Sequence, residues 1–274
     1  GVELVGAGLL FARLIFEYPA SKAAFFSIFH AVSAFCNAGF DLFGNSLANF
    51  TDDVYVNLII TTLFIVGGIG FAVIADIYRK QRFIDYSLNT KLVLLITLIL
   101  IVAGTGIIFI LEFSNSATLK SLSLKGKLLA AYFQGVTPRT AGFNTIPTGQ
   151  MRNATFFFIT ILMFIGASPG STGGGLKTTT IGALLAVVYN LVKGKEDIEL
   201  FKRRLSRSII YKALAVTIIS LAWIGLVVTV LTITEEAEFL PILFETVSAY
   251  GTVGLSTGIT DGLTKVGRII IILT

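Results

Sequence analysis

The sequence has little of what soluble enzymes use for chemistry. Its 274 residues include one cysteine, one histidine and five prolines, and only 14% of the residues are charged. A single cysteine, Cys36, forms no disulfide within the chain, and His30 alone is too little for the usual histidine-containing metal motifs. We therefore set aside redox chemistry and a dedicated protein metal site.

Apolar residues are abundant instead. They make up 54% of the chain and include 23 phenylalanines, a balance outside the range of ordinary soluble domains. Uncharged runs occupy residues 54–75, 92–111 and 213–234, which have 22, 20 and 22 residues. Because a membrane-spanning helix needs roughly 20 residues, each run predicts one spanning helix.

A further apolar run, residues 153–176, contains Pro169 and five glycines. A second uncharged stretch, residues 178–192, follows directly after Lys177. Proline and glycine both disfavour the interior of a helix. The two stretches therefore predict one long helix that is broken in its middle.

Basic residues cluster in two places between the apolar runs. The first cluster is Arg79, Lys80, Arg82 and Lys91, and the second is Lys193, Lys195, Lys202, Arg203, Arg204, Arg207 and Lys212. By the positive-inside rule both clusters are expected to be cytoplasmic. The net charge of +5 is thus explained by membrane orientation and anionic lipids, the latter especially at residues 201–212, and no nucleic-acid partner is expected.

One polar, glycine-bearing phrase occurs three times. It stands as SAFCNAGFD at residues 33–41, GVTPRTAGFN at residues 135–144 and SAYGTVGLS at residues 248–256. Aligned on Gly39, Gly142 and Gly254, the phrases lie 103 and 112 residues apart and share the order of apolar segments around them. A repeat of this length indicates a duplicated unit.

Each phrase follows an apolar segment too short to cross a bilayer, at about residues 23–34, 128–136 and 240–249. Re-entrant backbone at membrane depth is tolerated where it lines a water-filled cavity. A ring of backbone carbonyls can replace the hydration shell of a cation, and glycine reaches the backbone angles this needs. The alternative is that each glycine only permits a tight turn or close helix packing. Three glycines in register favour the ion pathway.

The three phrases, together with GASPGSTGGGLKTTT at residues 166–180, resemble the KtrB and TrkH type of potassium-translocating subunit in the Trk/Ktr/HKT superfamily, most of all KtrB. The resemblance covers essentially the whole chain. It implies an all-α membrane protein of repeated helix, re-entrant pore loop and helix units around a pseudo-fourfold pore. Residues 1–86, 87–200 and 201–274 would be the second, third and fourth pore repeats. A first repeat is then expected before Gly1, and an arginine that contacts the gate beyond Thr274.

Carried over position by position, the resemblance implies two sets of site residues. The selectivity filter would be formed by the backbone carbonyls of Asn37, Ala38, Gly39, Phe40, Thr140, Ala141, Gly142, Phe143, Thr252, Val253, Gly254 and Leu255. The gating loop would be formed by Gly166, Ala167, Ser168, Pro169, Gly170, Ser171, Thr172, Gly173, Gly174, Gly175 and Lys177. We further hypothesise that the charge of Lys177 repels cations when the loop is closed.

The function implied by the resemblance is potassium translocation across a bacterial inner membrane by a multi-pass subunit that is not an enzyme. The chain itself is expected to bind no cofactor, with potassium as substrate and sodium as a candidate activator. The implied partners are a second copy of the subunit and a cytoplasmic nucleotide-binding ring of RCK type that binds ATP and ADP. A sodium-permeable or sodium-coupled transporter of the same superfamily is the alternative.

Three interpretations from other classes also compete. GASPG at residues 166–170 matches the G-x-S-x-G elbow of serine hydrolases, but His30 precedes Ser168 whereas that fold places its histidine after the serine. GSTGGGLKT approaches a phosphate loop, but Lys177 follows Leu176 instead of the second glycine. A structural scaffold with plugged pore loops is the non-transport alternative, and it predicts no ion flux.

Three polar residues near the phrases allow two interpretations each. Arg139 either ties the third phrase to the outer face or tunes conduction, and the structural role is favoured. Asp41 and Asn144 follow their phrases at matching positions. They either concentrate cations at the mouth of the pathway or cap the loops.

Overall fold

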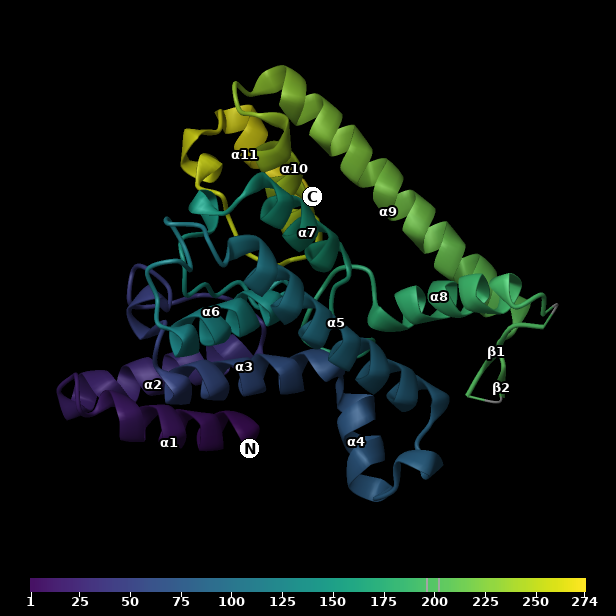
Figure 1. Cartoon of the computed structure of the whole chain (residues 1–274), viewed down its shortest axis with the longest axis horizontal. Coiled ribbons are helices and arrows are strands. Elements are labelled where there is room, and N and C mark those ends of the chain that lie inside the picture. The colour runs from purple at the N-terminus through teal and green to yellow at the C-terminus, as the bar shows by residue number, and fades with distance from the viewer. Residues whose placement is uncertain (196, 202) are drawn as a thin grey trace.

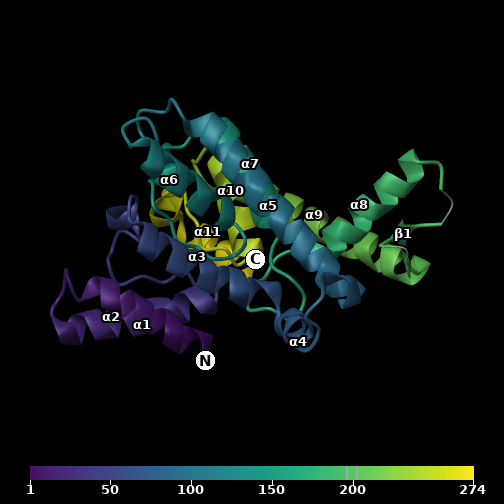
Figure 2. The same ribbon diagram turned by 60° about the horizontal axis from the view of Figure 1, so that its bottom comes forward.

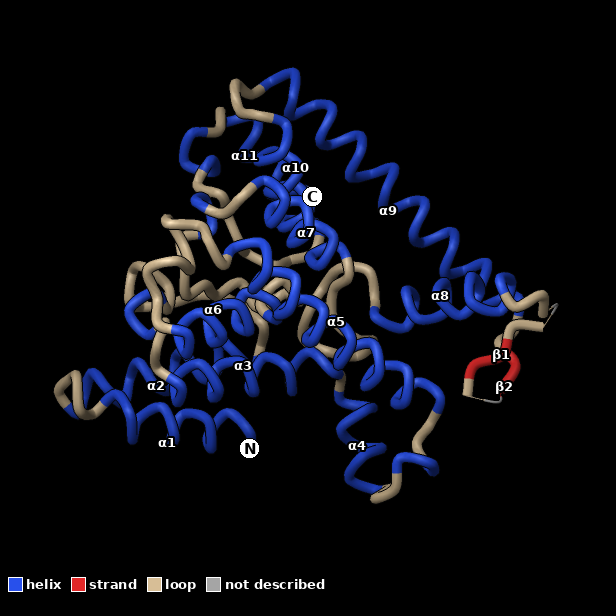
Figure 3. Tube along the Cα trace, in the orientation of Figure 1, coloured by secondary structure: helices blue, strands red, loops and turns tan. Residues whose placement is uncertain are grey.

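The computed structural model describes residues 1–195, 197–201 and 203–274, and most of the chain is helical (Figures 1 and 3). The α-helices are α1 (Val2–Leu14), α2 (Ala20–Phe35), α3 (Val54–Ile69), α4 (Phe71–Arg79), α5 (Leu88–Glu112), α6 (Leu124–Val136), α7 (Asn153–Phe164), α8 (Thr178–Val192), α9 (Arg207–Thr234), α10 (Phe239–Tyr250) and α11 (Lys265–Leu273). Short 3-10 turns are η1 (Ala48–Phe50), η2 (Phe83–Asp85), η3 (Thr148–Gln150) and η4 (Ile259–Gly262).

Two of the predicted spanning helices are confirmed as single helices. Within the described residues, α5 and α9 are long and apolar enough to cross a membrane. Each begins at a serine whose side chain accepts a backbone N–H of the first turn, Ser87 from Thr90 and Ser206 from Ile209. Such N-caps satisfy donors that the helix itself leaves free.

The prediction of one continuous helix over residues 54–75 is wrong. The chain bends by 93° between α3 and α4, so this run is a broken span or a re-entrant element. The bend lies at Gly70, whose φ of 93° is closed to most other residues. The run has no charge and no proline to mark the break, and its hydropathy therefore suggested a straight helix.

The basic segment after α8 is also more ordered than a loop. A two-residue antiparallel hairpin pairs β1 (Glu199–Leu200) with β2 (Arg203–Arg204), and this is the small exception to the predicted all-helical fold. Arg207 and Lys212 belong to α9 rather than to the loop. Lys202, part of the predicted basic cluster, lies outside the described residues. Both ribbon views show the hairpin with α8 and the start of α9 projecting from the rest of the molecule (Figures 1 and 2).

The three short apolar segments form the predicted short helices α2, α6 and α10, and two hydrophobic clusters hold them. One cluster joins α1, α2 and α3 to α6, with Phe64 edge-on to Phe133 at 5.9 Å between ring centroids. The other joins α5, α6, α7, α9 and α10, with Phe156 edge-on to Phe244 at 5.6 Å. These aromatic pairs pack α6 against α3 and α10 against α7.

Candidate functional site

Three four-residue phrases follow the short helices, and they share one backbone conformation. We call them phrase A (residues 37–40), phrase B (residues 140–143) and phrase C (residues 252–255). The first residue of each has a left-handed φ, 53° at Asn37, 65° at Thr140 and 51° at Thr252. The third residue is the aligned glycine, with φ of 73° at Gly39, 78° at Gly142 and 86° at Gly254. A non-glycine residue rarely adopts this conformation, so its threefold occurrence marks a constrained site.

The phrases lie side by side although about one hundred residues separate them in the chain. A Cβ atom placed on Gly39 would lie 2.8 Å from the carbonyl oxygen of Ala141. A Cβ atom on Gly142 would lie 2.5 Å from the carbonyl oxygen of Val253. Gly142 therefore stands in the middle, between phrases A and C. Both its positive φ and the neighbouring backbone require glycine there.

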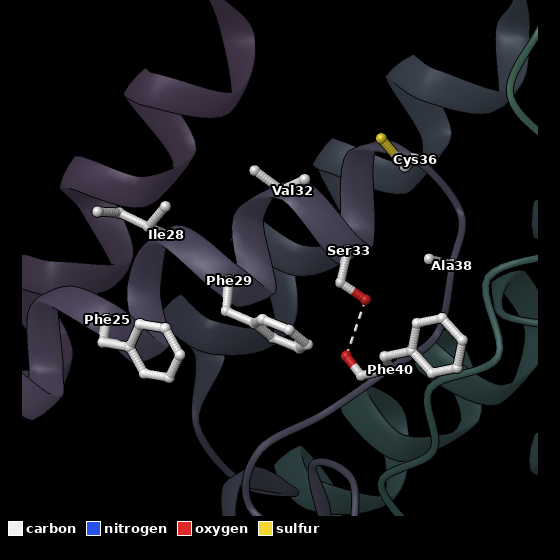
Figure 4. A pocket seen from close by; sticks show the side chains of 8 residues that line it. All are labelled: Phe25, Ile28, Phe29, Val32, Ser33, Cys36, Ala38 and Phe40. Atoms are coloured by element: carbon white, nitrogen blue, oxygen red, sulfur yellow. Dashed lines mark hydrogen bonds between the residues drawn. The ribbon is translucent and has the colours of Figure 1, made fainter.

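One flank of this group is open. The side chain of Phe143 is fully buried and that of Leu255 is 3% exposed, whereas that of Phe40 in phrase A is 70% exposed. Beside phrase A, the outer face of α2 forms an apolar groove of about 380 Å³ (Figure 4). Its lining residues are Phe25, Ile28, Phe29, Val32, Ser33, Cys36, Ala38 and Phe40. The three phrases thus lie next to one another in the order A, B and C, with an apolar surface beside phrase A.

The predicted break in the long helix is confirmed, and a loop that joins α7 to α8 occupies it. We call residues 165–177 the central loop. Its two ends run side by side, because the N–H of Gly166 donates to the carbonyl of Leu176 at 3.0 Å and that of Ala167 to Gly174 at 3.1 Å. A side chain at Gly166 would collide with the backbone of Gly174. The glycines of this loop therefore permit a narrow double strand of backbone.

The central loop contacts the first residue of every phrase. The hydroxyl of Thr172 donates to the side-chain oxygen of Asn37 at 3.0 Å, and the N–H of Gly174 donates to the hydroxyl of Thr252 at 3.1 Å. A side chain at Gly173 would collide with the hydroxyl of Thr140. The loop thus lies against one side of the group of phrases.

A second set of bonds ties the central loop to the α3–α4 junction (residues 67–71). The N–H of Ser168 donates to the carbonyl of Gly68 at 3.0 Å, and that of Thr172 to Gly67 at 3.3 Å. In the other direction, the N–H of Phe71 donates to the carbonyl of Gly170 at 3.0 Å. Sequence analysis missed this junction, and the glycine-rich GGIG at residues 67–70 was the signal for it.

Lys177 and Ser168 have structural partners within the loop. The ammonium of Lys177 donates to the carbonyl of Gly173 at 2.7 Å, and the buried hydroxyl of Ser168 accepts from Thr178 at 2.9 Å. His30 is buried elsewhere, where its Nε2 accepts the N–H of Leu42 at 3.2 Å. Its Nδ1 lies 2.7 Å from the carbonyl of Phe26, so the neutral ring must carry its proton on Nδ1. Ser168 and His30 thus bond to different partners, and neither of these two residues is arranged for hydrolysis.

The other polar residues near the phrases make hydrogen bonds within the surrounding loops, and both interpretations of Asp41 and Asn144 stay predictions. Asp41 accepts the N–H of Gly44 at 2.7 Å, and the N–H of Asn144 donates to the hydroxyl of Ser46 at 3.0 Å. Arg139 is 4% exposed, and its carbonyl accepts from the side-chain amide of Asn37 at 3.3 Å. Its backbone thereby links phrase B to phrase A, whereas its buried Nε has no hydrogen-bond partner among the described residues, so the structural role of the side chain stays a prediction.

Comparisons with known proteins identify relatives over nearly the whole chain. Residues 10–274 match the family described as TrkH, cation transport protein. The Ktr system potassium uptake protein B of Bacillus subtilis is 49% identical over 272 residues, which cover 99% of this chain and 61% of that protein. The potassium/sodium uptake protein NtpJ of Enterococcus hirae is 39% identical over 277 residues, again 99% of this chain and 61% of the relative.

The fold has a counterpart among solved structures. The crystal structure of the potassium transporter TrkH from Vibrio parahaemolyticus matches with a TM-score of 0.78 and 18% sequence identity. The match covers 99% of this chain and 58% of that one. The chain therefore spans about three fifths of the length of the relatives that it matches.

Proposed function

Because the chain belongs to the TrkH family of cation transport proteins, we propose that phrases A, B and C form the selectivity filter of a potassium pathway. One observation carries the proposal: three phrases distant in sequence share two left-handed residues each and meet at Gly142. This conformation can turn successive carbonyl groups to one side, where together they replace the hydration shell of a cation. The chain is a cation transport protein and not an enzyme.

The pathway is completed by a fourth wall. The groove on α2 and the exposed side chain of Phe40 mark the side on which that wall packs (Figure 4). We assign it to a first repeat in the part of the relatives' length that this chain does not span. The result is a pseudo-fourfold arrangement in which residues 1–86, 87–200 and 201–274 supply three of the four pore repeats.

The central loop is the gate of this pathway. It lies against Asn37, Thr140 and Thr252, which are the first residues of the three filter phrases, and so stands where a permeating ion must leave or enter the filter. Its glycines and Pro169 keep it from joining α7 and α8 into one rigid helix. A loop of this kind can move aside without unfolding a spanning helix.

The relatives also support a proposal about the partners of this chain. The name of the relative from Bacillus subtilis places it in a Ktr system, which supports a partnership of this chain with other components of such a system. We propose a homodimer of membrane subunits and a cytoplasmic ring of RCK type that binds ATP and ADP. The basic residues at the α4–α5 connection and near the hairpin are the surfaces suited to the cytoplasmic side.

Potassium uptake by a bacterial strain deficient in potassium uptake tests the proposal. The strain expresses the full-length gene with its natural partner, as wild type or as Gly142→Ser, and grows in low-potassium medium. We expect wild type to restore uptake and Gly142→Ser to weaken it or to admit sodium. Wild-type protein that reaches the membrane and moves only sodium would favour the sodium alternative, which the name of the relative from Enterococcus hirae keeps open.

A further inference from the structure

Each filter phrase is held by one hydroxyl group from the end of its short helix. The hydroxyl of Ser33 donates to the carbonyl of Phe40 at 2.8 Å, as Figure 4 shows. Thr137 donates to the carbonyl of Phe143 at 2.6 Å, and Ser248 to the carbonyl of Leu255 at 2.6 Å. In all three phrases the acceptor is the fourth residue, directly after the aligned glycine.

The same three residues also hold the second position of each phrase through their own carbonyl groups. The N–H of Ala38 donates to the carbonyl of Ser33 at 2.8 Å, and the N–H of Val253 donates to that of Ser248 at 2.8 Å. In phrase B the N–H of Ala141 donates to the carbonyl of Thr137 at 3.0 Å. Each hydroxyl residue therefore brackets the glycine of its phrase, with one bond before it and one bond after it.

Phrase B differs in register, and this difference is informative. Ser33 and Ser248 stand six residues before their glycines, where the third repeat has Val136. In phrase B the N–H of the second residue bonds to a carbonyl four residues earlier, whereas in phrases A and C it bonds to one five residues earlier, so the bracketing position falls on the next residue, Thr137. The hydroxyl group thus keeps its place relative to the backbone hydrogen bond, although its place relative to the glycine differs by one residue. A hydroxyl group at the shifted position indicates that the bond to the fourth carbonyl is needed in every repeat.

We propose that Ser33, Thr137 and Ser248 are positioning residues that set the ion selectivity of the filter at its fourth carbonyl layer. The inference rests on the proposed function and deepens it. A carbonyl oxygen has two lone pairs, and the hydroxyl occupies one of them. Only the other remains for an ion, and the hydrogen bond fixes the carbonyl so that it cannot close around a smaller cation. Without the hydroxyl, the carbonyl oxygen has both lone pairs free and the backbone around it is no longer fixed.

The turns after phrases A and C have a second support from their own short helix, whereas the turn after phrase B is supported from another loop, where the N–H of Asn144 donates to the hydroxyl of Ser46 at 3.0 Å. His30 accepts the N–H of Leu42, and Glu245 accepts the N–H of Thr257 at 2.7 Å, so the turn after each of these phrases is also held. Both acceptors stand nine residues before their glycines, where the third repeat has Phe133. Loss of the hydroxyl is therefore expected to matter most at Thr137.

The test compares hydroxyl-deleted variants of the full-length protein with matched controls. The variants are Ser33→Ala, Thr137→Val and Ser248→Ala, reconstituted in liposomes for measurement of the potassium-to-sodium permeability ratio. Ser27 lies on the same helix as Ser33, and Thr145 lies just after phrase B; both hydroxyls are buried and lack a hydrogen-bond partner among the described residues. Ser27→Ala and Thr145→Val therefore delete the same group without touching a filter carbonyl.

We expect each hydroxyl deletion to lower the permeability ratio about two- to tenfold, with the largest loss in Thr137→Val, while both controls keep the wild-type ratio. Thr137→Ser retains the hydroxyl and should retain the ratio even if Thr137→Val folds poorly. Wild-type selectivity in the three deletions, or an equal loss in Thr137→Ser, overturns the inference. Wild-type protein that carries no cation would instead overturn the proposed function itself.

Discussion

The backbone N–H of Phe71, the first residue of α4, donates a hydrogen bond to the carbonyl of Gly170 in the central loop at 3.0 Å. The carbonyls of Gly67 and Gly68 accept two further N–H groups of that loop. The sharp bend between α3 and α4 thus exposes backbone groups of both helices to the loop, which a straight helix would have kept for itself. The position of the loop is coupled to the angle of this bend.

If the central loop is the gate as proposed, Phe71→Pro should raise basal potassium flux by a factor of about two to ten, because it deletes one hydrogen bond to that loop. Proline is well tolerated at the first position of a helix, so α4 itself should persist. Flux is measured in liposomes with the full-length protein and without activating nucleotide.

Phe71→Ala is the matched control, since it removes the same side chain and keeps the N–H group. Its basal flux should equal that of wild type, and the potassium-to-sodium ratio of both variants should be unchanged. Equal fluxes in Phe71→Pro and wild type would show that the bond to Gly170 does not help to close the gate.

Lys177 holds the central loop by a bond rather than only by its charge. Its ammonium donates to the carbonyl of Gly173, next to the contact with Thr140. Lys177→Met removes both the donor and the charge, whereas Lys177→Gln keeps donor groups without the charge. We expect basal flux to rise in Lys177→Met and to rise less in Lys177→Gln. Equal increases in the two variants would instead favour the hypothesis of electrostatic repulsion.

Much of the fold was predictable because its signals are local. The apolar runs at residues 92–111 and 213–234 lie within α5 and α9, and the three short segments form α2, α6 and α10. The break around Pro169 follows from residues that destabilise helices. These predictions needed only the period, length and composition of one stretch at a time.

The parts that were missed depend on contacts between distant residues. Alignment on the glycines placed Val136 opposite Ser33 and Ser248, and so concealed the hydroxyl of Thr137 one position later. The glycines at residues 67–70 mark a weak point of the α3–α4 run, but they reveal neither the backbone angle at Gly70 nor its partners, which lie about one hundred residues away in the central loop. Hydropathy indicates whether a segment is apolar enough to lie in lipid. It contains no information on hydrogen bonds between residues that are distant in the sequence.

The close crossing of α5 and α6 predicts a difference between two neighbouring glycines. A Cβ atom on Gly104 would lie 2.6 Å from the carbonyl of Gly135, whereas one on Gly106 would have no atom within 4 Å among the described residues. Gly104→Ala should therefore destabilise the protein by about 1–3 kcal/mol through overpacking. Gly106→Ala should leave stability unchanged or raise it by up to about 1 kcal/mol, because alanine favours helix. Thermal unfolding in detergent measures both, and similar midpoints would contradict the predicted crossing.

The C-terminal end of α9 provides a pH-dependent contact. The carboxylate of Glu235 accepts the hydroxyl of Thr264 at 2.6 Å and its N–H at 2.7 Å, and these bonds lower the pKa of the carboxyl group below its usual value. A lowered pKa in the folded state means that the charged form stabilises the fold. That contribution is complete above the unfolded-state pKa of about 4.3 and is lost as the pH falls through the folded-state value.

Glu235→Gln should therefore lower the midpoint of thermal unfolding at neutral pH, and its difference from wild type should shrink as the pH falls below about 4. Glu236→Gln, which removes the exposed carboxylate next to it, controls for the loss of one negative charge at this surface. Thr264 caps α11, so the effect should appear as earlier loosening of the C-terminal helix, which hydrogen exchange of residues 265–273 can follow. A difference between wild type and Glu235→Gln that stays constant down to pH 3 would mean that the carboxylate charge is not what anchors α11 to α9.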